Sequence, residues 1–139
     1  MAQAQFWLGE GTVVGGRYRL ESVLGVGGYG ITYKGLDLRL ERNVAVKEFY
    51  PSFWVSRFSE MSPEVRIMQG MEENFEKGMS RFVDEAKTLA HLSDIPAVVR
   101  VSDVFPENNT TYLVMDFLDG KNLKQMAEGF GGRIPPDAE

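Results

Sequence analysis

Cysteine is absent from this chain of 139 residues, and histidine occurs once, at His91. Without cysteine the chain has no disulfide bond, thiol catalyst or thiolate-bound metal, and one histidine excludes a site built on several histidines. No apolar run approaches the roughly 20 residues that a membrane helix needs. The first ten residues also lack the basic segment followed by an apolar one that marks a signal peptide. We therefore expect no metal site and no membrane segment in this chain, and a cytoplasmic location. A membrane anchor outside this segment stays open.

Acidic residues outnumber basic ones, 20 against 15, and the net charge is −5. An acidic chain has no overall attraction to nucleic acid or to an anionic membrane surface. Hydrophobic residues make up 43% and charged residues 25% of the chain, which is the balance of a folded globular protein. The length has room for one domain of ordinary size.

Five strands are predicted, at about 17–24, 31–36, 44–50, 98–105 and 110–117, the first from alternating apolar residues and the second from its β-branched and aromatic residues. The sequence Glu107-Asn108-Asn109 suits a hairpin turn between the last two strands. A helix is predicted from about residue 72 to 92. Its apolar positions recur in steps of four and three and so form one face: Phe75, Met79, Phe82, Ala86 and Leu89. The fold class is therefore α+β, with a five-stranded antiparallel sheet and one main helix.

Three segments lie outside these elements. Residues 51–70 carry Phe53, Trp54 and Phe58, and a polar linker would not, so we expect an ordered loop folded onto the sheet. A short helix is predicted at 123–128. The glycine- and proline-rich tail that follows has no packing pattern and is predicted to be at least partly disordered.

The most distinctive motif is the glycine-rich sequence Gly25-Val26-Gly27-Gly28-Tyr29-Gly30. Glycines let backbone amides approach phosphate oxygens closely, but the pattern also fits a plain glycine-rich hairpin. A dinucleotide-binding loop requires a helix at the last glycine and an acid about 20 residues later. A strand is predicted after Gly30 instead, and the lysine Lys47 stands near the expected acid. The pattern therefore favours a flap between two strands that covers a ligand.

Two charged residues are candidate functional residues beside this flap. Lys47 is predicted on the inner face of its strand, where a buried lysine needs an anion, although a lysine at a strand edge commonly reaches solvent. Glu85 borders the apolar face of the predicted helix and could supply a carboxylate, although an acid there is usually only an edge residue.

Taken in order, these motifs resemble the small (N-terminal) lobe of a protein kinase, specifically the bacterial serine/threonine kinases of the eukaryotic type. The resemblance runs from about residue 17 to 123. It rests on the glycine-rich loop, the strand Val44-Ala45-Val46-Lys47, the helix with Glu85, and the last strand, Tyr112-Leu113-Val114-Met115-Asp116-Phe117. It implies an N-terminal extension (1–16), a small lobe (17–118) with a long insertion (51–70), and the hinge exit with the start of a large lobe (119–139).

The resemblance also implies roles for individual residues. Lys47 would contact the α- and β-phosphates of ATP and pair with Glu85. The remaining residues implied to bind ATP lie on the glycine-rich loop, the sheet and the hinge: Leu24, Gly25, Gly27, Gly28, Gly30, Thr32, Ala45, Met115, Asp116 and Leu118. Mg²⁺ would accompany ATP, with its ligands in the missing large lobe.

Several departures from the family pattern matter. Thr32 replaces a valine, and Lys121 or Asn122 stands where an acid often binds ribose. Between Lys47 and Glu85 lies a separation of 38 residues, which is long for a compact kinase. The family's H-R-D catalytic loop is missing, because the only histidine precedes Leu92-Ser93. Its D-F-G magnesium motif is missing as well, because Asp116-Phe117 is followed by Leu118 and not by glycine. We therefore expect a small-lobe fragment that is inactive by itself.

Three hypotheses follow. The first is the ATP-binding lobe of a kinase that phosphorylates serine or threonine in a protein substrate. The second is a non-catalytic interaction or scaffold module, or the lobe of a pseudokinase. The third, a dinucleotide-binding domain, is disfavoured by the strand after the glycines. An isolated lobe would expose apolar surface that the large lobe normally covers, so we also expect a homodimer.

Overall fold

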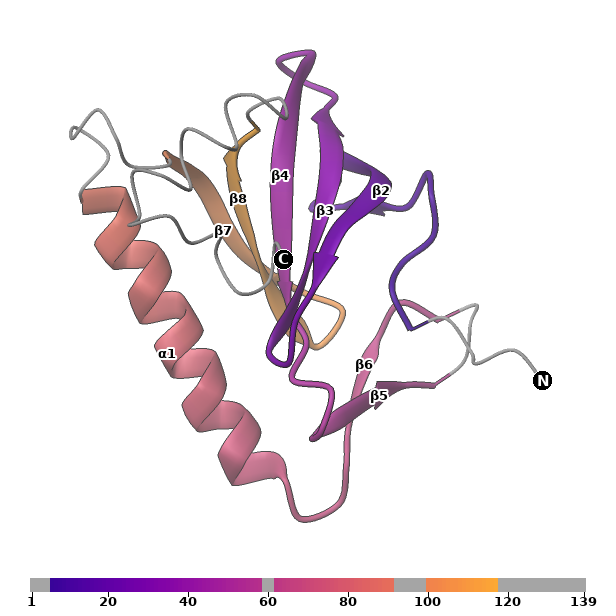
Figure 1. The fold of residues 1–139 in the computed structure, drawn as a ribbon, viewed down its shortest axis with the longest axis vertical. Coiled ribbons are helices and arrows are strands. Elements are labelled where there is room, and N and C mark those ends of the chain that lie inside the picture. Colours follow the sequence, from indigo (N-terminus) through magenta and orange to yellow (C-terminus); the bar gives the residue numbers. More distant parts are fainter. Residues whose placement is uncertain (1–5, 59–61, 92–99, 118–139) are drawn as a thin grey trace.

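A curled antiparallel sheet with the strand order β1-β2-β3-β4-β8-β7 forms the centre of the fold (Figure 1). The computed structural model describes residues 6–58, 62–91 and 100–117. The six strands are β1 (Val13–Val14), β2 (Tyr18–Val26), β3 (Gly30–Asp37), β4 (Arg42–Phe49), β7 (Val101–Glu107) and β8 (Thr110–Asp116). The α+β class and the antiparallel sheet are confirmed.

The expected count of five strands was wrong, because β1 adds a sixth at the edge. Its two residues pair with β2, Val13 opposite Arg19 and Val14 opposite Tyr18. Gly15 and Gly16 turn the chain between these strands with φ values of 63° and 62°, which favour glycine. A strand of two residues is too short to show an alternating pattern, and it lies in the segment assigned to an N-terminal extension.

Two hairpin turns are set by short polar side chains. At the end of β3, the Asp37 carboxylate accepts hydrogen bonds from the Arg39 and Leu40 amides, at 2.9 and 3.2 Å. Between β7 and β8, Asn108 and Asn109 take positive φ values of 54° and 61°. Asparagine tolerates this left-handed backbone better than most residues, so the predicted turn is confirmed.

Helix α1 (Glu72–His91) lies beside the sheet and packs against β7 and β8. Its buried residues, Phe75, Phe82 and Ala86, belong to the predicted apolar face. The Phe75 and Phe82 rings lie 5.3 and 5.4 Å from the ring of Phe49 on β4. This aromatic contact fixes the helix against the sheet, and the predicted bounds agree with the observed ones to within one residue.

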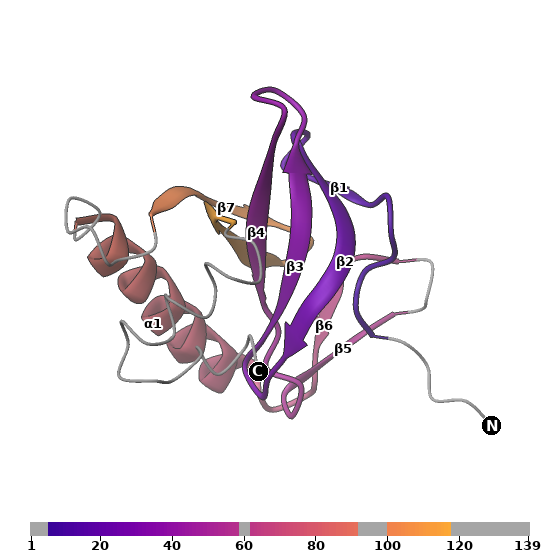
Figure 2. The same ribbon diagram turned by 45° about the horizontal axis from the view of Figure 1, so that its top comes forward.

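Residues 51–70 contain a second, two-stranded sheet of β5 (Val55–Arg57) and β6 (Val65–Ile67). Figures 1 and 2 show this ribbon and α1 on opposite sides of the main sheet. Val55 and Val65 are buried, so the described residues of this segment pack as expected, although they form two strands rather than the expected loop. Of its three aromatic residues, however, only Trp54 is half-buried, whereas Phe53 and Phe58 are more than half exposed.

Within the described part of the chain, no helix is both long and apolar enough to cross a membrane. The predicted short helix at 123–128, the tail after it, and the first two residues of the predicted strand 98–105 lie outside the described residues. Leu118, Lys121 and Asn122 lie outside them as well.

Candidate functional site

The glycine-rich motif forms the hairpin between β2 and β3, and its tip is tied to the chain that follows β4. Within the hairpin, the Gly27 amide donates to the Gly30 carbonyl at 2.8 Å. The amides of Tyr50 and Ser52 donate to the carbonyls of Tyr29 and Gly28, at 2.9 and 3.2 Å. Since β3 begins at Gly30, a strand and not a helix follows the last glycine, as predicted. This arrangement lacks the helix that a dinucleotide-binding loop requires.

Gly30 must lack a side chain for a steric reason. A Cβ atom at this position would lie 2.9 Å from the backbone oxygen of Glu48 on β4. The close approach of β3 and β4 therefore continues into the glycine-rich loop, and it holds the loop next to the strand that carries Lys47.

A pocket of about 520 Å³ lies between the glycine-rich loop, β4 and α1. Its lining includes residues that the sequence singled out, namely Gly27, Gly28, Gly30, Lys47 and Glu85. Loop amides, a lysine and a carboxylate from three separate segments thus share one concave surface. With Lys77 and Arg81 of α1 also in its lining, the pocket holds three cations and one carboxylate, which suits an anionic ligand.

Lys47 on β4 and Glu85 on α1 line the same pocket. The Lys47 ammonium lies 5.7 Å from the centre of the Phe82 ring, while Glu85 is exposed on the next turn of α1.

Four residues implied to surround adenine or adjoin the lysine share one face of the sheet. Thr32 on β3 pairs with Lys47, and Met115 on β8 pairs with Ala45, which lies two residues before Lys47 on β4. Directly paired residues of antiparallel strands point to the same face. This face adjoins the pocket, although Thr32, Ala45 and Met115 do not line it.

The other residues implied to bind ATP flank this face. Leu24 and Gly25 lie on β2, where the pairing with β3 is irregular between Val23 and Gly25. The Asp116 amide donates to the Arg100 carbonyl at 3.0 Å, so an adenine contact at this residue would use its carbonyl oxygen. Leu118 lies outside the described residues.

Several pocket residues were not anticipated from the sequence. Asn74, Lys77 and Arg81 precede Glu85 along one side of α1, and Trp54 comes from the segment after β4. The three helical residues follow one another at steps of three and four, which place them along one stripe of the helix. That spacing was visible in the sequence, but exposed charges on a helix are ordinarily its solvated face.

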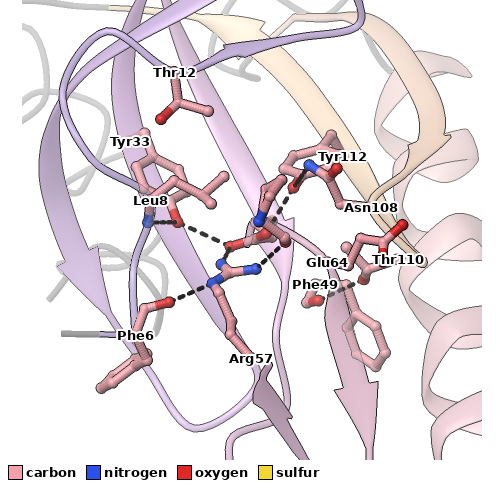
Figure 3. A network of polar contacts seen from close by, with 12 residues as sticks. Phe6, Leu8, Thr12, Tyr33, Phe49, Arg57, Glu64, Asn108, Thr110 and Tyr112 are labelled. Atoms are coloured by element: carbon pink, nitrogen blue, oxygen red, sulfur yellow. Dashed lines mark hydrogen bonds and ion pairs between the residues drawn. The ribbon is translucent and has the colours of Figure 1, made fainter. Parts of the chain in front are cut away.

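On the opposite face of the sheet, Glu48 is fully buried in a polar network with Tyr33, Tyr112 and Arg57, which Figure 3 labels. Its carboxylate accepts hydrogen bonds from the hydroxyls of Tyr33 and Tyr112, at 2.8 and 2.7 Å, and pairs with the Arg57 guanidinium at 2.5 Å. Burial, and then the Glu48 charge, raise the pKa of both tyrosines. Although burial opposes the charged form of Arg57, the Glu48 carboxylate holds its pKa above the ordinary value.

Arg57 also binds the N-terminal segment to the ribbon. Its Nε donates to the Phe6 carbonyl at 2.5 Å and its Nη1 to the Pro63 carbonyl at 2.6 Å. The Leu8 amide donates to the Tyr33 hydroxyl at 3.1 Å. One buried carboxylate thus joins the sheet, the β5–β6 ribbon and the N-terminal segment.

Comparison with curated proteins gives a consistent set of relatives. A probable serine/threonine-protein kinase of Clostridium acetobutylicum is 31% identical over 121 residues, which are 87% of this chain and 15% of the relative. The serine/threonine-protein kinase PrkC of Bacillus subtilis is 29% identical over 128 residues, which are 92% of this chain and 17% of that protein. The chain thus spans about a sixth of the length of these relatives. No family model matches it.

A solved structure shows the same fold. The apo form of PpkA-294 superposes with a TM-score of 0.77 and 30% sequence identity, covering 86% of this chain and 43% of that one. The resemblance found from the ordered motifs is therefore confirmed in both sequence and fold.

Proposed function

Because the chain is similar in sequence and fold to the small lobe of bacterial serine/threonine protein kinases, we propose that it binds ATP in the pocket under its glycine-rich loop. The observation that carries this proposal is the shared pocket of the loop and Lys47. The loop amides would cover the phosphates, and the Lys47 ammonium would contact the α- and β-phosphates. Adenine would lie against the sheet face of Ala45, Thr32 and Met115.

In the proposed active state, Glu85 pairs with Lys47 and holds its ammonium toward the phosphates. The two side chains face one pocket, as such a pair requires. The carboxylate would orient the lysine. The pairing is therefore a condition for activity rather than a support of the fold.

Mg²⁺ is expected to accompany ATP, but the described residues do not suit it. They contain no group of three or more His, Cys, Asp or Glu side chains that could hold a metal. Glu85 is the one carboxylate that lines the pocket, according to the described residues. We therefore assign no magnesium ligand here and expect the ligands in a large lobe.

For the longer protein, we propose transfer of the ATP γ-phosphoryl group to serine or threonine of a protein substrate, in the cytoplasm. This requires a large lobe with a base for the acceptor hydroxyl and the magnesium ligands. The alternative is the lobe of a pseudokinase or a non-catalytic interaction module. Pairing of Lys47 with Glu85 in the presence of a large lobe and ATP would decide for the kinase.

ATP titration into the chain, followed by calorimetry, tests the proposal. We expect weak binding that falls roughly tenfold in Lys47→Met, because the phosphates lose a charge-assisted contact. Lys87→Met is the matched control, since Lys87 is an exposed lysine of α1 outside the pocket. Absence of ATP binding, or equal affinity in the Lys47→Met and Lys87→Met variants, would contradict the proposal.

A further inference from the structure

Trp54 lies between the two elements that a nucleotide would have to bring together, the glycine-rich loop and α1. Its indole lines the pocket and lies edge-on to Tyr29 at the tip of the loop, with ring centres 6.0 Å apart. The same indole is edge-on to Phe53 at 5.4 Å, and Phe53 is edge-on to Tyr29 at 5.2 Å. The three rings form a closed cluster, which we call the aromatic cluster.

The backbone of Trp54 is held on both sides. Its amide donates to the Pro51 carbonyl at 2.8 Å, and its carbonyl accepts from the Met68 amide at 2.8 Å. The indole therefore does not hang from a loose loop. It is presented to the pocket by hydrogen bonds that connect the start and the end of the 51–70 segment.

On its other side, Trp54 meets α1 at a position that has no side chain. A Cβ atom at Gly78 would lie 3.2 Å from Trp54 Cζ3 and 2.8 Å from Phe49 Cζ. The helix thus approaches these two rings as closely as its backbone allows. A larger residue at 78 would have to push the helix or the rings away.

Gly78 and Glu85 are seven residues apart, which is about two turns of an α-helix. They therefore lie on nearly the same side of α1, and both line the pocket. A shift of the helix at Gly78 is a shift of the face that carries Glu85. The indole that limits the approach at Gly78 thus also limits how near Glu85 comes to Lys47.

We propose that Trp54 is a positioning residue that couples the glycine-rich loop to helix α1 and, through the helix, to Glu85. When the loop moves, Tyr29 presses on or releases the indole, and the indole transmits this to the helix at Gly78. The 51–70 segment, which carries Trp54, is then part of the nucleotide site rather than a surface insertion without a role in it. This inference deepens the proposed function, and the part of it that concerns ATP rests on that function.

A ligand-free experiment tests the coupling directly. The Tyr50 and Ser52 amides donate to loop carbonyls, so their hydrogen exchange reports the loop position. We expect Gly78→Ala to change these exchange rates roughly threefold or more, as coupled contacting residues do. In a Trp54→Ala background the same change should have little effect, and Trp54→Phe should restore part of it. Ser80→Ala, on the exposed side of α1, is the control.

Two outcomes overturn the inference. One is an unchanged exchange of the Tyr50 and Ser52 amides in Gly78→Ala. The other is the same change with and without the Trp54 indole, which would make Trp54 a packing residue only. If Gly78→Ala does not fold, the exchange of residues 72–91 in Trp54→Ala and Trp54→Phe decides, because only the ring should preserve the wild-type pattern.

A second experiment adds ATP and uses the fluorescence of the Trp54 indole as the probe. The chain has two tryptophans, and Trp7 packs near Phe6, away from the residues that line the pocket. We expect ATP to change the emission of Trp7→Phe but not of Trp54→Phe, and to alter exchange in both the loop and α1 only when the indole is present. No ATP response in any variant would count against the proposed function, while a loop response without a helix response would count against the coupling.

Discussion

Lys47 and Glu48 are neighbours on β4 whose side chains leave the sheet on opposite faces. Lys47 reaches the pocket under the glycine-rich loop, and Glu48 is fully buried among two tyrosines and Arg57. The alternation of a β-strand places an exposed function and a buried anchor on adjacent residues. The position of Lys47 therefore depends on the polar network of Glu48 on the other face of the same strand.

Loss of the cation in this network should destabilise the fold strongly. Arg57→Met leaves the Glu48 carboxylate buried without its charged partner, at a cost of about 3–5 kcal/mol in the free energy of unfolding. The matched control is Lys77→Met, which breaks an exposed pair with Glu73 of 3.1 Å and should cost less than about 1 kcal/mol. Urea unfolding followed by circular dichroism measures both. Equal losses would show that the buried pair has no special weight.

Acid should weaken the fold through Asp37. Hydrogen bonds from Arg17, at 2.9 Å to each carboxylate oxygen, lower the pKa of Asp37 from 3.8 to about 2. A lowered folded-state pKa stabilises the fold above the unfolded value, and this contribution is lost as the pH falls from about 4 through 2. Asp37→Asn should remove most of this dependence in unfolding experiments between pH 5 and 2. A pH profile that Asp37→Asn leaves unchanged would refute the assignment, with Glu73→Gln as the exposed control.

The helix cations should strengthen binding of the phosphate end of a nucleotide. Lys77 and Arg81 line the pocket opposite the glycine-rich loop. Changing both to glutamine should lower the affinity for ATP and for inorganic tripolyphosphate roughly fivefold, with little effect on AMP, because only the longer anions reach the helix. Lys87→Gln, outside the pocket, should leave all three affinities unchanged. A uniform loss for AMP and ATP would point to a folding defect instead.

The chain by itself should transfer no phosphoryl group. Neither the H-R-D nor the D-F-G motif occurs in its sequence, so the acceptor hydroxyl lacks a base. An assay with Mg-ATP and a generic protein acceptor should stay at the level of the enzyme-free control. Activity that survives rigorous purification and disappears in Lys47→Met would disprove this expectation.

Self-association should occur at micromolar concentration. Leu89, Val101 and Met115 are half-buried apolar residues on the side that a large lobe would cover, and exposed apolar patches beyond about 300–600 Å² are uncommon in monomers. The net charge of −5 opposes association, but salt screens it over about 8–10 Å. Sedimentation velocity in buffered salt should show a dimer that Met115→Lys weakens. A monomer at every concentration would exclude this interface.

Much of the fold could be predicted because it depends on local periodicity. The alternating strands and the steps of four and three in α1 are properties of single segments, and the two asparagines mark their own turn. Strand β1 was missed because its two residues form a strand only by pairing with Arg19 and Tyr18. The same limit applies to any element that exists through its partner.

The site was predictable where chemistry lies in a motif and not where it depends on packing. The glycines and Lys47 could be picked out from their residue types and their order along the chain. Glu48 looked like an ordinary residue after the lysine, because its burial depends on Arg57 from an irregular segment and on Tyr112 from the last strand. Trp54 was noted only as an aromatic, since nothing local shows that Gly78 comes to meet it.

The strand order has a consequence for how the chain folds. Strands β1 to β4 form a local meander, but β8 pairs with β4 only after the ribbon and the helix have been made, and Tyr112 reaches Glu48 across 64 residues. Contacts between distant residues carry a larger loop-closure cost and slow the folding of a domain. During synthesis the meander can form while Glu48 still lacks Arg57 and Tyr112. The hydrogen bonds and the ion pair of the buried Glu48 carboxylate are therefore completed late in folding, after both Arg57 and Tyr112 have been synthesised.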